Sequence, residues 1–280
     1  MKAAFKYFFL WILLSLVGLF GLFVIYWIAS ICIPSFSFKP SDLQEDSLLS
    51  SFTIMFATQI LPISVFLKKK YTNFSFKFKY CFGADFSKKK FYFWVAIAAL
   101  GCLLFDLILT QVFPILDEWN EMLFGKDDSE LSLNFIEVIS GCIMAPLVEE
   151  AIFRGAIERR LLEKNWNPWI AIVISAIFFA IPHGKIYIFF SFFGILVGWL
   201  YYRTGCVWPG IVAHVINNSI AAVMAIGLLI SGDELVDDQL LPLGVSIPLL
   251  IVGLAMMFFS VRQIAIMTKD RKLATPSTGE

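Results

Sequence analysis

Long apolar runs follow one another along the chain and limit what it can fold into. The first extends from Tyr7 to Ile33, with no charged side chain between Lys6 and Lys39. It exceeds the roughly 20 apolar residues that a helix needs to cross a hydrocarbon core about 30 Å thick. Charged residues make up only 16% of the 280 residues and hydrophobic ones 59%, whereas ordinary soluble domains carry about 25% charge. The sequence therefore predicts an integral, multi-pass membrane protein with an all-α fold.

Eight stretches of the chain are predicted to form a bundle of about eight transmembrane helices. They are Tyr7–Ile33, Ser47–Leu67, Phe91–Phe113, Leu131–Glu163, Pro168–Pro182, Ile186–Tyr202, Cys206–Ile230 and Leu240–Val261. We divide the chain accordingly into three parts. Residues 1–130 hold three N-terminal helices with a basic cytoplasmic loop at 68–90, residues 131–230 form a core, and residues 231–280 hold the last helix and a cytoplasmic tail.

The distribution of charge predicts the orientation of these helices. If the N-terminus is cytoplasmic, 19 of the 22 Lys and Arg residues fall in cytoplasmic segments, as the positive-inside rule requires. Eight spans with both termini cytoplasmic are the consistent solution. The 22 acidic residues balance the 22 basic ones, so the basic excess typical of nucleic-acid binding proteins is missing. Membrane lipid is the expected partner, and no nucleic acid is expected.

Ionisable residues inside the predicted spans gather in one part of the chain. Such residues are costly in a bilayer and mark functional sites by default. Apart from Asp106, they all fall between residues 137 and 214, and they are Glu137, Glu149, Glu150, Arg154, His183 and His214. This clustering predicts a functional site in the core.

Two consecutive glutamates lie at the centre of this group. Glu150 and Arg154 are four residues apart, in the favourable order for an ion pair on a helix. Glu149 points about 100° away on the same helix, so it lacks that partner and is a candidate for a reactive carboxylate. Pro146, one turn earlier, removes a backbone hydrogen bond and is expected to kink the helix. The alternative is two acids and an arginine at the cytoplasmic end of a helix.

The two histidines of the chain lie on later apolar segments. His183 stands between Pro182 and Gly184, which indicates an unwound segment, tolerated in a membrane only inside protein or beside a cavity. His214 and Asn218 share one helix face, where two polar donors can stabilise an oxyanion. The alternatives are hydrogen bonds that pack helices together, and Asn217 is an equally possible donor by geometry.

Three motifs together carry a family resemblance. They are Glu149/Glu150/Arg154 (E-E-x-x-x-R), Phe179/His183 (F-x-x-x-H) and His214/Asn218 (H-x-x-x-N) on successive apolar helices. In this order they resemble the CAAX protease and bacteriocin-processing family of intramembrane glutamic endopeptidases, which are related to the CAAX prenyl endopeptidase. The stretch from Gly194 to Ser219 is also similar, and the resemblance covers about residues 131–230.

The resemblance implies an endopeptidase that hydrolyses a membrane-associated or lipidated peptide with activated water. Glu149 would be the general base, His183 would orient the water, and His214 and Asn218 would stabilise the oxyanion. Glu150 and Arg154 would support the end of the helix. A bacterial inner membrane is the expected location.

Other classes of function stay open at this stage. Two His and two Glu are possible zinc ligands, which would make the chain a membrane metalloprotease, although the H-E-x-x-H spacing is missing. No cofactor is otherwise expected. A non-catalytic immunity or scaffold protein of the same family is a second alternative. A transporter is a third, although no internal repeat typical of transporters is obvious.

Overall fold

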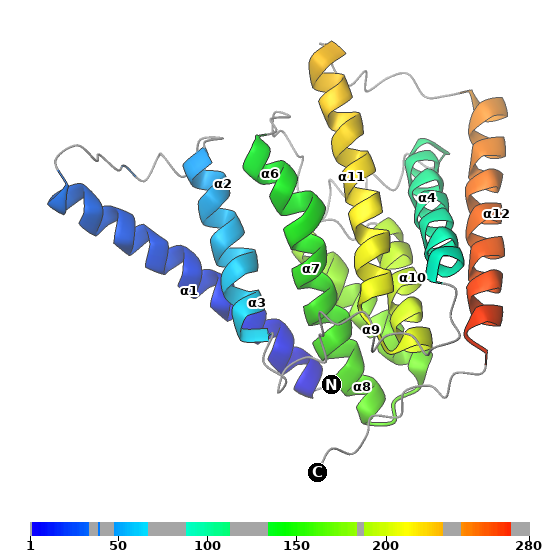
Figure 1. The fold of residues 1–280 in the computed structure, drawn as a ribbon, viewed down its shortest axis with the longest axis horizontal. Helices are drawn as coiled ribbons and strands as arrows, with labels where there is room; N and C mark the ends of the chain where they lie inside the picture. Colours follow the sequence, from blue (N-terminus) through cyan, green and yellow to red (C-terminus); the bar gives the residue numbers. More distant parts are fainter. Residues whose placement is uncertain are drawn as a thin grey trace.

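The computed structural model describes residues 2–33, 39, 48–66, 88–112, 134–183, 188–231 and 242–269. Within these ranges, all regular secondary structure is helical (Figure 1). This confirms the predicted all-α fold. The predicted loop at 68–90 lies largely outside the described residues, and its last residues, 88–90, already belong to a helix.

The N-terminal third contains α1 (Lys2–Cys32), a helix formed by α2 (Leu48–Met55), the π-helical segment η2 (Phe56–Ile60) and α3 (Leu61–Phe66), and then α4 (Lys88–Val112). A second composite helix follows, made of α6 (Phe135–Ile139), η4 (Ser140–Met144), α7 (Ala145–Glu149), η5 (Glu150–Glu158) and α8 (Arg159–Glu163). The remaining elements are α9 (Pro168–Ala180), the 3₁₀ turn η6 (Ile181–His183), α10 (Ile188–Thr204), α11 (Trp208–Ser231) and α12 (Leu243–Met267).

Several helices of the described part are long enough to cross a membrane. Five meet that condition by length and composition, at Phe5–Cys32, Leu48–Phe66, Lys89–Leu109, Trp208–Gly227 and Leu243–Met267. They coincide with five of the predicted spans. By contrast, α9 has only 13 residues, about 20 Å at 1.5 Å per residue, which is shorter than the hydrocarbon core. These helices make the chain an integral membrane protein.

Helices pack closely where a glycine, which has no side chain, lies at the contact between them. α12 packs along α4, and α10 packs along α9. A Cβ atom added to Gly101 of α4 would lie 2.8 Å from Cβ of Met256, and one added to Gly253 of α12 would lie 2.9 Å from the backbone nitrogen of Phe105. Small residues at such contacts let helix backbones approach, as is usual for membrane helices.

Two of the π-helical segments precede a proline. In η4, the Ala145 N–H bonds to the Ser140 carbonyl, five residues back. In this spacing the Gly141 carbonyl would need the N–H of residue 146, which is Pro146 and has none. π-Helical segments are frequent at functional sites. At this proline, where the sequence predicts a kink, the structure shows a wider helical turn with a carbonyl open to another partner.

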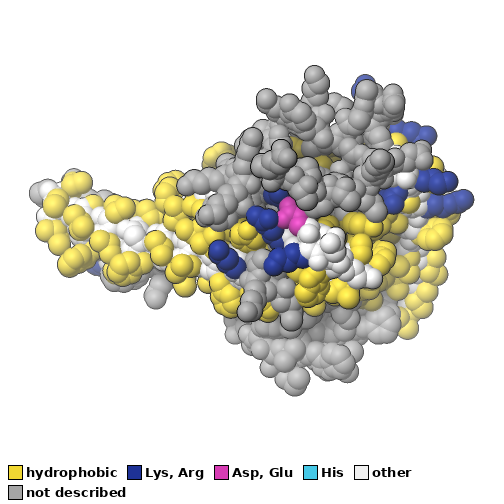
Figure 2. All heavy atoms as spheres, turned by 90° about the horizontal axis from the view of Figure 1, so that it is seen from below, with side chains coloured by type: hydrophobic (Ala, Val, Ile, Leu, Met, Phe, Trp, Pro, Cys, Tyr) yellow, Lys and Arg dark blue, Asp and Glu magenta, His cyan; other side chains and the backbone are white. Residues whose placement is uncertain are grey.

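The beginning of α1 and the ends of α8, α10 and α12 lie at the same end of the bundle (Figure 1). Figure 2 shows Lys and Arg side chains on this face. Exposed basic residues near these helix ends are Lys6, Lys164, Arg262 and Lys269. Arg203, at the end of α10, donates to the Thr268 hydroxyl at 2.9 Å and so connects α10 to the end of α12. The grouping agrees with the charge pattern that predicts a cytoplasmic face, while the orientation itself stays a prediction.

Candidate active site

The composite helix from Phe135 to Glu163 supplies both glutamates of the first motif. Glu149 ends α7, and Glu150 begins the π-helical segment η5. Because consecutive helical residues point in different directions, the two carboxylates have different surroundings. The Glu150 side chain is fully buried, whereas 16% of the Glu149 side chain is accessible.

The carboxylate of Glu149 faces both histidines. Its Oε2 atom lies 4.0 Å from Nε2 of His183 and 3.8 Å from Nε2 of His214. Oε2 is buried and has no hydrogen-bond partner among the described residues. Polar atoms separated by slightly more than hydrogen-bonding distance are commonly bridged by water. The structure thus brings together three residues from three different predicted motifs.

A short turn accounts for the position of His183. The α9 helix ends at Ala180 and the chain continues as the 3₁₀ turn η6 through Pro182 to His183. Counted along the predicted helices, His183 lies several residues deeper in the bilayer than His214, and either helix tilt or unwinding at Pro182 would bring them level. In the structure, Nδ1 of His183 lies 2.8 Å from the Phe179 carbonyl. Since a carbonyl only accepts, Nδ1 donates this hydrogen bond, and Nε2 is the ring nitrogen that faces Glu149.

Glu150 occupies the centre of a buried polar network. Its Oε1 atom accepts a hydrogen bond from Nη1 of Arg154 at 2.9 Å, which is the ion pair predicted from the sequence, and lies 3.3 Å from Nδ1 of His214. Arg154 also donates to the Gly194 carbonyl at 3.1 Å, and its guanidinium lies 4.6 Å from the centre of the Phe179 ring. Glu150 therefore holds Arg154 and His214 at once.

Close contact with a glycine fixes the second oxygen of Glu150. A Cβ atom added to Gly210 would lie 2.6 Å from Oε2 of Glu150. Only glycine leaves this space free. Gly210 stands four residues before His214 on α11, so one helix provides both the space for the carboxylate and the imidazole that contacts it.

Asn218 is one turn beyond His214, but its amide has another partner. Its Nδ2 atom donates to the Gly141 carbonyl at 2.8 Å, which is the carbonyl left open by the π-helical turn before Pro146. Asn218 thereby connects α11 to the composite helix. One N–H of the amide is used in this bond, and the second stays available to a substrate. The neighbouring Asn217 is 8% exposed, and its Oδ1 atom has no hydrogen-bond partner among the described residues.

The other two acids singled out in the sequence lie elsewhere. Glu137 forms a capping box with Asn134 at the start of α6 and accepts a hydrogen bond from Ser51 at 2.7 Å, so it stabilises the beginning of that helix. Asp106 lies on α4. Neither is one of the residues that face Glu149.

Sequence reasoning missed a third buried acid. Glu158 is fully buried on η5, and neither of its carboxylate oxygens has a hydrogen-bond partner among the described residues. Gly198 of α10 leaves room for it, because a Cβ atom there would lie 2.9 Å from Oε2 of Glu158. The repeated spacing of four residues from Glu150 through Arg154 to Glu158 is the signal that could have identified it.

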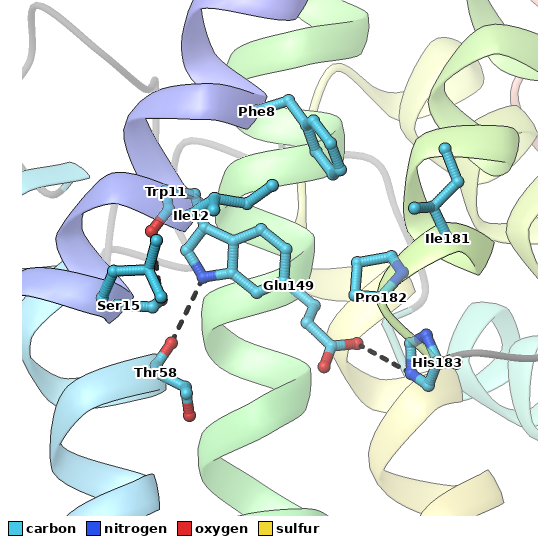
Figure 3. A pocket seen from close by; sticks show the side chains of 10 residues that line it. Phe8, Trp11, Ile12, Ser15, Thr58, Glu149, Ile181, Pro182 and His183 are labelled. Atoms are coloured by element: carbon cyan, nitrogen blue, oxygen red, sulfur yellow. Dashed lines mark hydrogen bonds and ion pairs between the residues drawn. The ribbon is translucent and has the colours of Figure 1, made fainter. Parts of the chain in front are cut away.

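A cavity of about 450 Å³ opens beside Glu149 and His183 (Figure 3). α1 and the helix containing η2 form one side of it, and the end of α9 forms the other. Its lining is apolar except for four residues, and it consists of Phe8, Trp11, Ile12, Ser15, Leu16, Thr58, Glu149, Ile181, Pro182 and His183. An apolar chamber that contains a carboxylate and an imidazole is suited to holding a substrate next to reactive groups.

Among the residues that the structure describes, no group of three or more His, Cys, Asp or Glu side chains has an arrangement that could hold a metal ion. The described site brings together the carboxylate of Glu149 and the imidazoles of His183 and His214.

Comparison with known proteins finds a match in the core of the chain. Residues 131–220 match the family model described as "Type II CAAX prenyl endopeptidase Rce1-like". This segment is similar to the CAAX prenyl endopeptidase family. It contains all seven residues of the three motifs, from Glu149 to Asn218, whereas α1, α4 and α12 lie outside it.

One curated relative is similar to this chain over a segment about as long as the family match. It is the protein named "Putative membrane peptidase YdiL" from Bacillus subtilis (strain 168), 35% identical over 89 residues. The alignment covers 31% of this chain and 36% of the relative, so the chain matches about a third of the length of that protein. No solved structure matches the chain significantly.

Proposed function

We propose that this chain is an intramembrane endopeptidase in which Glu149 activates water to hydrolyse a peptide bond. The observation that carries the proposal is the placement of Glu149 Oε2, unpartnered and within 4.0 Å of both His183 and His214, beside an apolar cavity. The family match of residues 131–220 and the similarity to a membrane peptidase support it. The substrate is a membrane-associated or lipidated peptide, and the membrane is the inner membrane of a bacterium.

The tautomer of His183 suits the binding of water. Nδ1 donates to the Phe179 carbonyl, so Nε2 accepts one hydrogen of a water molecule, while the carboxylate of Glu149 accepts the other. The oxygen of that water then presents a lone pair to the carbonyl carbon of the substrate. As its C–O bond forms, Glu149 takes the proton, and the peptide becomes a tetrahedral oxyanion.

The oxyanion is stabilised by His214 and Asn218. Nδ1 of His214 contacts a carboxylate that only accepts, so this nitrogen carries a proton. Glu150 accepts from Nδ1 and so orients the ring, and Nε2, which faces Glu149, is the atom proposed to contact the oxyanion. The free N–H of Asn218 is the second donor. Collapse of the intermediate breaks the C–N bond, and Glu149 returns its proton to the leaving amine.

The test is cleavage of membrane-anchored, internally quenched peptides by purified protein reconstituted in lipid. The wild type and Glu149→Ala are compared, with Glu163→Ala as the control, because Glu163 pairs with Arg159 and Arg160 near the end of α8. Cleavage by the wild type and the control, but not by Glu149→Ala, supports an enzyme. A wild type that cleaves no membrane peptide favours the scaffold alternative.

A further inference from the structure

Helix α1 lies outside the segment that matches the family, yet it forms one wall of the cavity beside Glu149. Five of the ten lining residues belong to α1 and follow its inner face at helical spacing, at positions 8, 11, 12, 15 and 16. Figure 3 shows the ring of Trp11 extending from α1 toward Glu149. The cavity is thus built partly from residues that are separate from the catalytic motifs.

Trp11 is held in place by a hydrogen bond to a neighbouring helix. Its indole Nε1 donates to the Thr58 carbonyl, in the π-helical segment η2, at 3.2 Å. An edge-to-face contact with Phe153, with ring centres 5.6 Å apart, supports the other part of the indole. The large side chain of Trp11 is therefore a fixed wall and not a mobile one.

The polar side chains of the cavity, other than Glu149 and His183, do not offer donors to a ligand. The Ser15 hydroxyl donates to the Trp11 carbonyl at 3.0 Å, and the Thr58 hydroxyl donates to the Ile54 carbonyl at 2.7 Å. Among the residues that the structure describes, no Lys or Arg lines the cavity. An acidic group would be desolvated there without a cationic partner, which is unfavourable, and the carboxylate of Glu149 would in addition repel it.

We propose that this cavity binds an apolar side chain of the substrate peptide next to the bond that is cleaved, and that Trp11 determines the size of the side chain that fits. The proposal rests on the proposed function, since it places the scissile bond at Glu149. A volume of about 450 Å³ lies within the ~300–1,000 Å³ usual for ligand pockets, so a large aliphatic or aromatic group fits. α1 is then the element that gives this chain its own specificity.

Selectivity is measured as kcat/KM on quenched peptides that differ at one position beside the scissile bond, carrying alanine, leucine, phenylalanine, tryptophan or glutamate. Trp11→Ala enlarges the cavity. It therefore raises the kcat/KM of the tryptophan peptide relative to that of the leucine peptide by about tenfold or more, as changes of pocket volume do. Ser15→Phe fills the cavity and shifts the ratio the other way. Trp27→Ala is the matched control, because Trp27 lies on the same helix, is 57% exposed and does not line the cavity.

Opposite shifts by an enlarging and a filling substitution cannot both come from misfolding. Trp11→Phe keeps a ring but loses the N–H, so its ratio lies between those of the wild type and Trp11→Ala. Equal ratios in the wild type, Trp11→Ala and Ser15→Phe overturn the proposal. So does preferred cleavage of the glutamate peptide.

Occupancy is tested separately from catalysis in the Glu149→Gln variant. A peptide with benzoylphenylalanine at the same position is photo-crosslinked, and the adducts are mapped by mass spectrometry. Adducts at Trp11, Ile12 or Ile181 support the proposal even where no cleavage is measured, so failure of the proposed function is distinguishable. Adducts only elsewhere overturn it. Labelling of these residues by a benzophenone phospholipid that the peptide does not displace also overturns it, because a bilayer lipid is then the occupant.

Discussion

Replacing Gly210 with alanine tests the buried network through a single added carbon. The new Cβ would lie 2.6 Å from Oε2 and 3.2 Å from Cδ of Glu150. A carboxylate at the end of a flexible side chain could normally turn aside. Here it cannot move freely, because it is fully buried and its other oxygen holds Arg154 at 2.9 Å and His214 at 3.3 Å.

The magnitude follows from two opposing effects. Overpacking a filled interior costs ~1–3 kcal/mol, whereas alanine is favoured over glycine in a helix by ~1 kcal/mol. Gly227 is the matched control, because it lies on the same helix, α11, and a Cβ atom there would have no neighbour within 4 Å. Both substitutions gain the same helix preference, so it cancels between them. Gly210→Ala should therefore be less stable than Gly227→Ala by the overpacking cost alone, about 1–3 kcal/mol.

Activity should respond more strongly than stability. A shifted Glu150 carries His214 with it, and misplacement of a reacting group by about 1 Å can cost about 100-fold in rate. Thermal unfolding in detergent and kcat/KM on a membrane-anchored peptide measure the two effects. If Gly210→Ala unfolds at the same temperature as Gly227→Ala and cleaves at the same rate, the network does not hold His214 as described.

Three further outcomes are expected. Glu150→Ala and Arg154→Ala should each lower the free energy of unfolding by about 3–5 kcal/mol, because either change leaves a buried charge without its partner. In a double-mutant cycle the double variant should lose less than the sum of the two single variants, and strict additivity would contradict the pairing. Strong chelators should leave peptide cleavage intact, since Glu149, His183 and His214 are proposed to hold water; loss of cleavage restored by zinc would identify a metalloprotease. Asn218→Ala should lower kcat about 10²–10³-fold, as loss of an oxyanion donor does, and unchanged kcat would leave Asn218 with only a structural role.

The sequence predicted the elements of the site because each rule involved is local. A membrane span is predicted by counting the apolar residues in a run. Five of the predicted spans coincide with helices that are long and apolar enough to cross a membrane. The pair of Glu150 and Arg154 follows from a spacing of four residues on one helix. Helix geometry alone also predicts that the side chain of Glu149 points away from this pair and so has different surroundings from that of Glu150.

Contacts between distant segments could not be predicted in this way. The approach of His183 and His214 to the same carboxylate oxygen depends on a 3₁₀ turn and on the packing of α9 against η5. The contribution of Trp11 depends on the Thr58 carbonyl, which belongs to another helix. Nor did periodicity predict the π-helical turns, two of which precede a proline that interrupts the hydrogen bonds of a helix. The partner of Asn218, the Gly141 carbonyl, is a result of one such turn.

The central claim is that the Glu149 carboxylate takes a proton from the attacking water. Glutamine is nearly isosteric with glutamate but cannot accept that proton, and the unpaired Oε2 means that little stability should be lost. The direct measurement is kcat/KM of purified Glu149→Gln in lipid, together with its unfolding temperature. Cleavage reduced at least about 10²-fold, as for loss of a general base, at an unchanged unfolding temperature is the predicted result. Turnover equal to that of the wild type would contradict it.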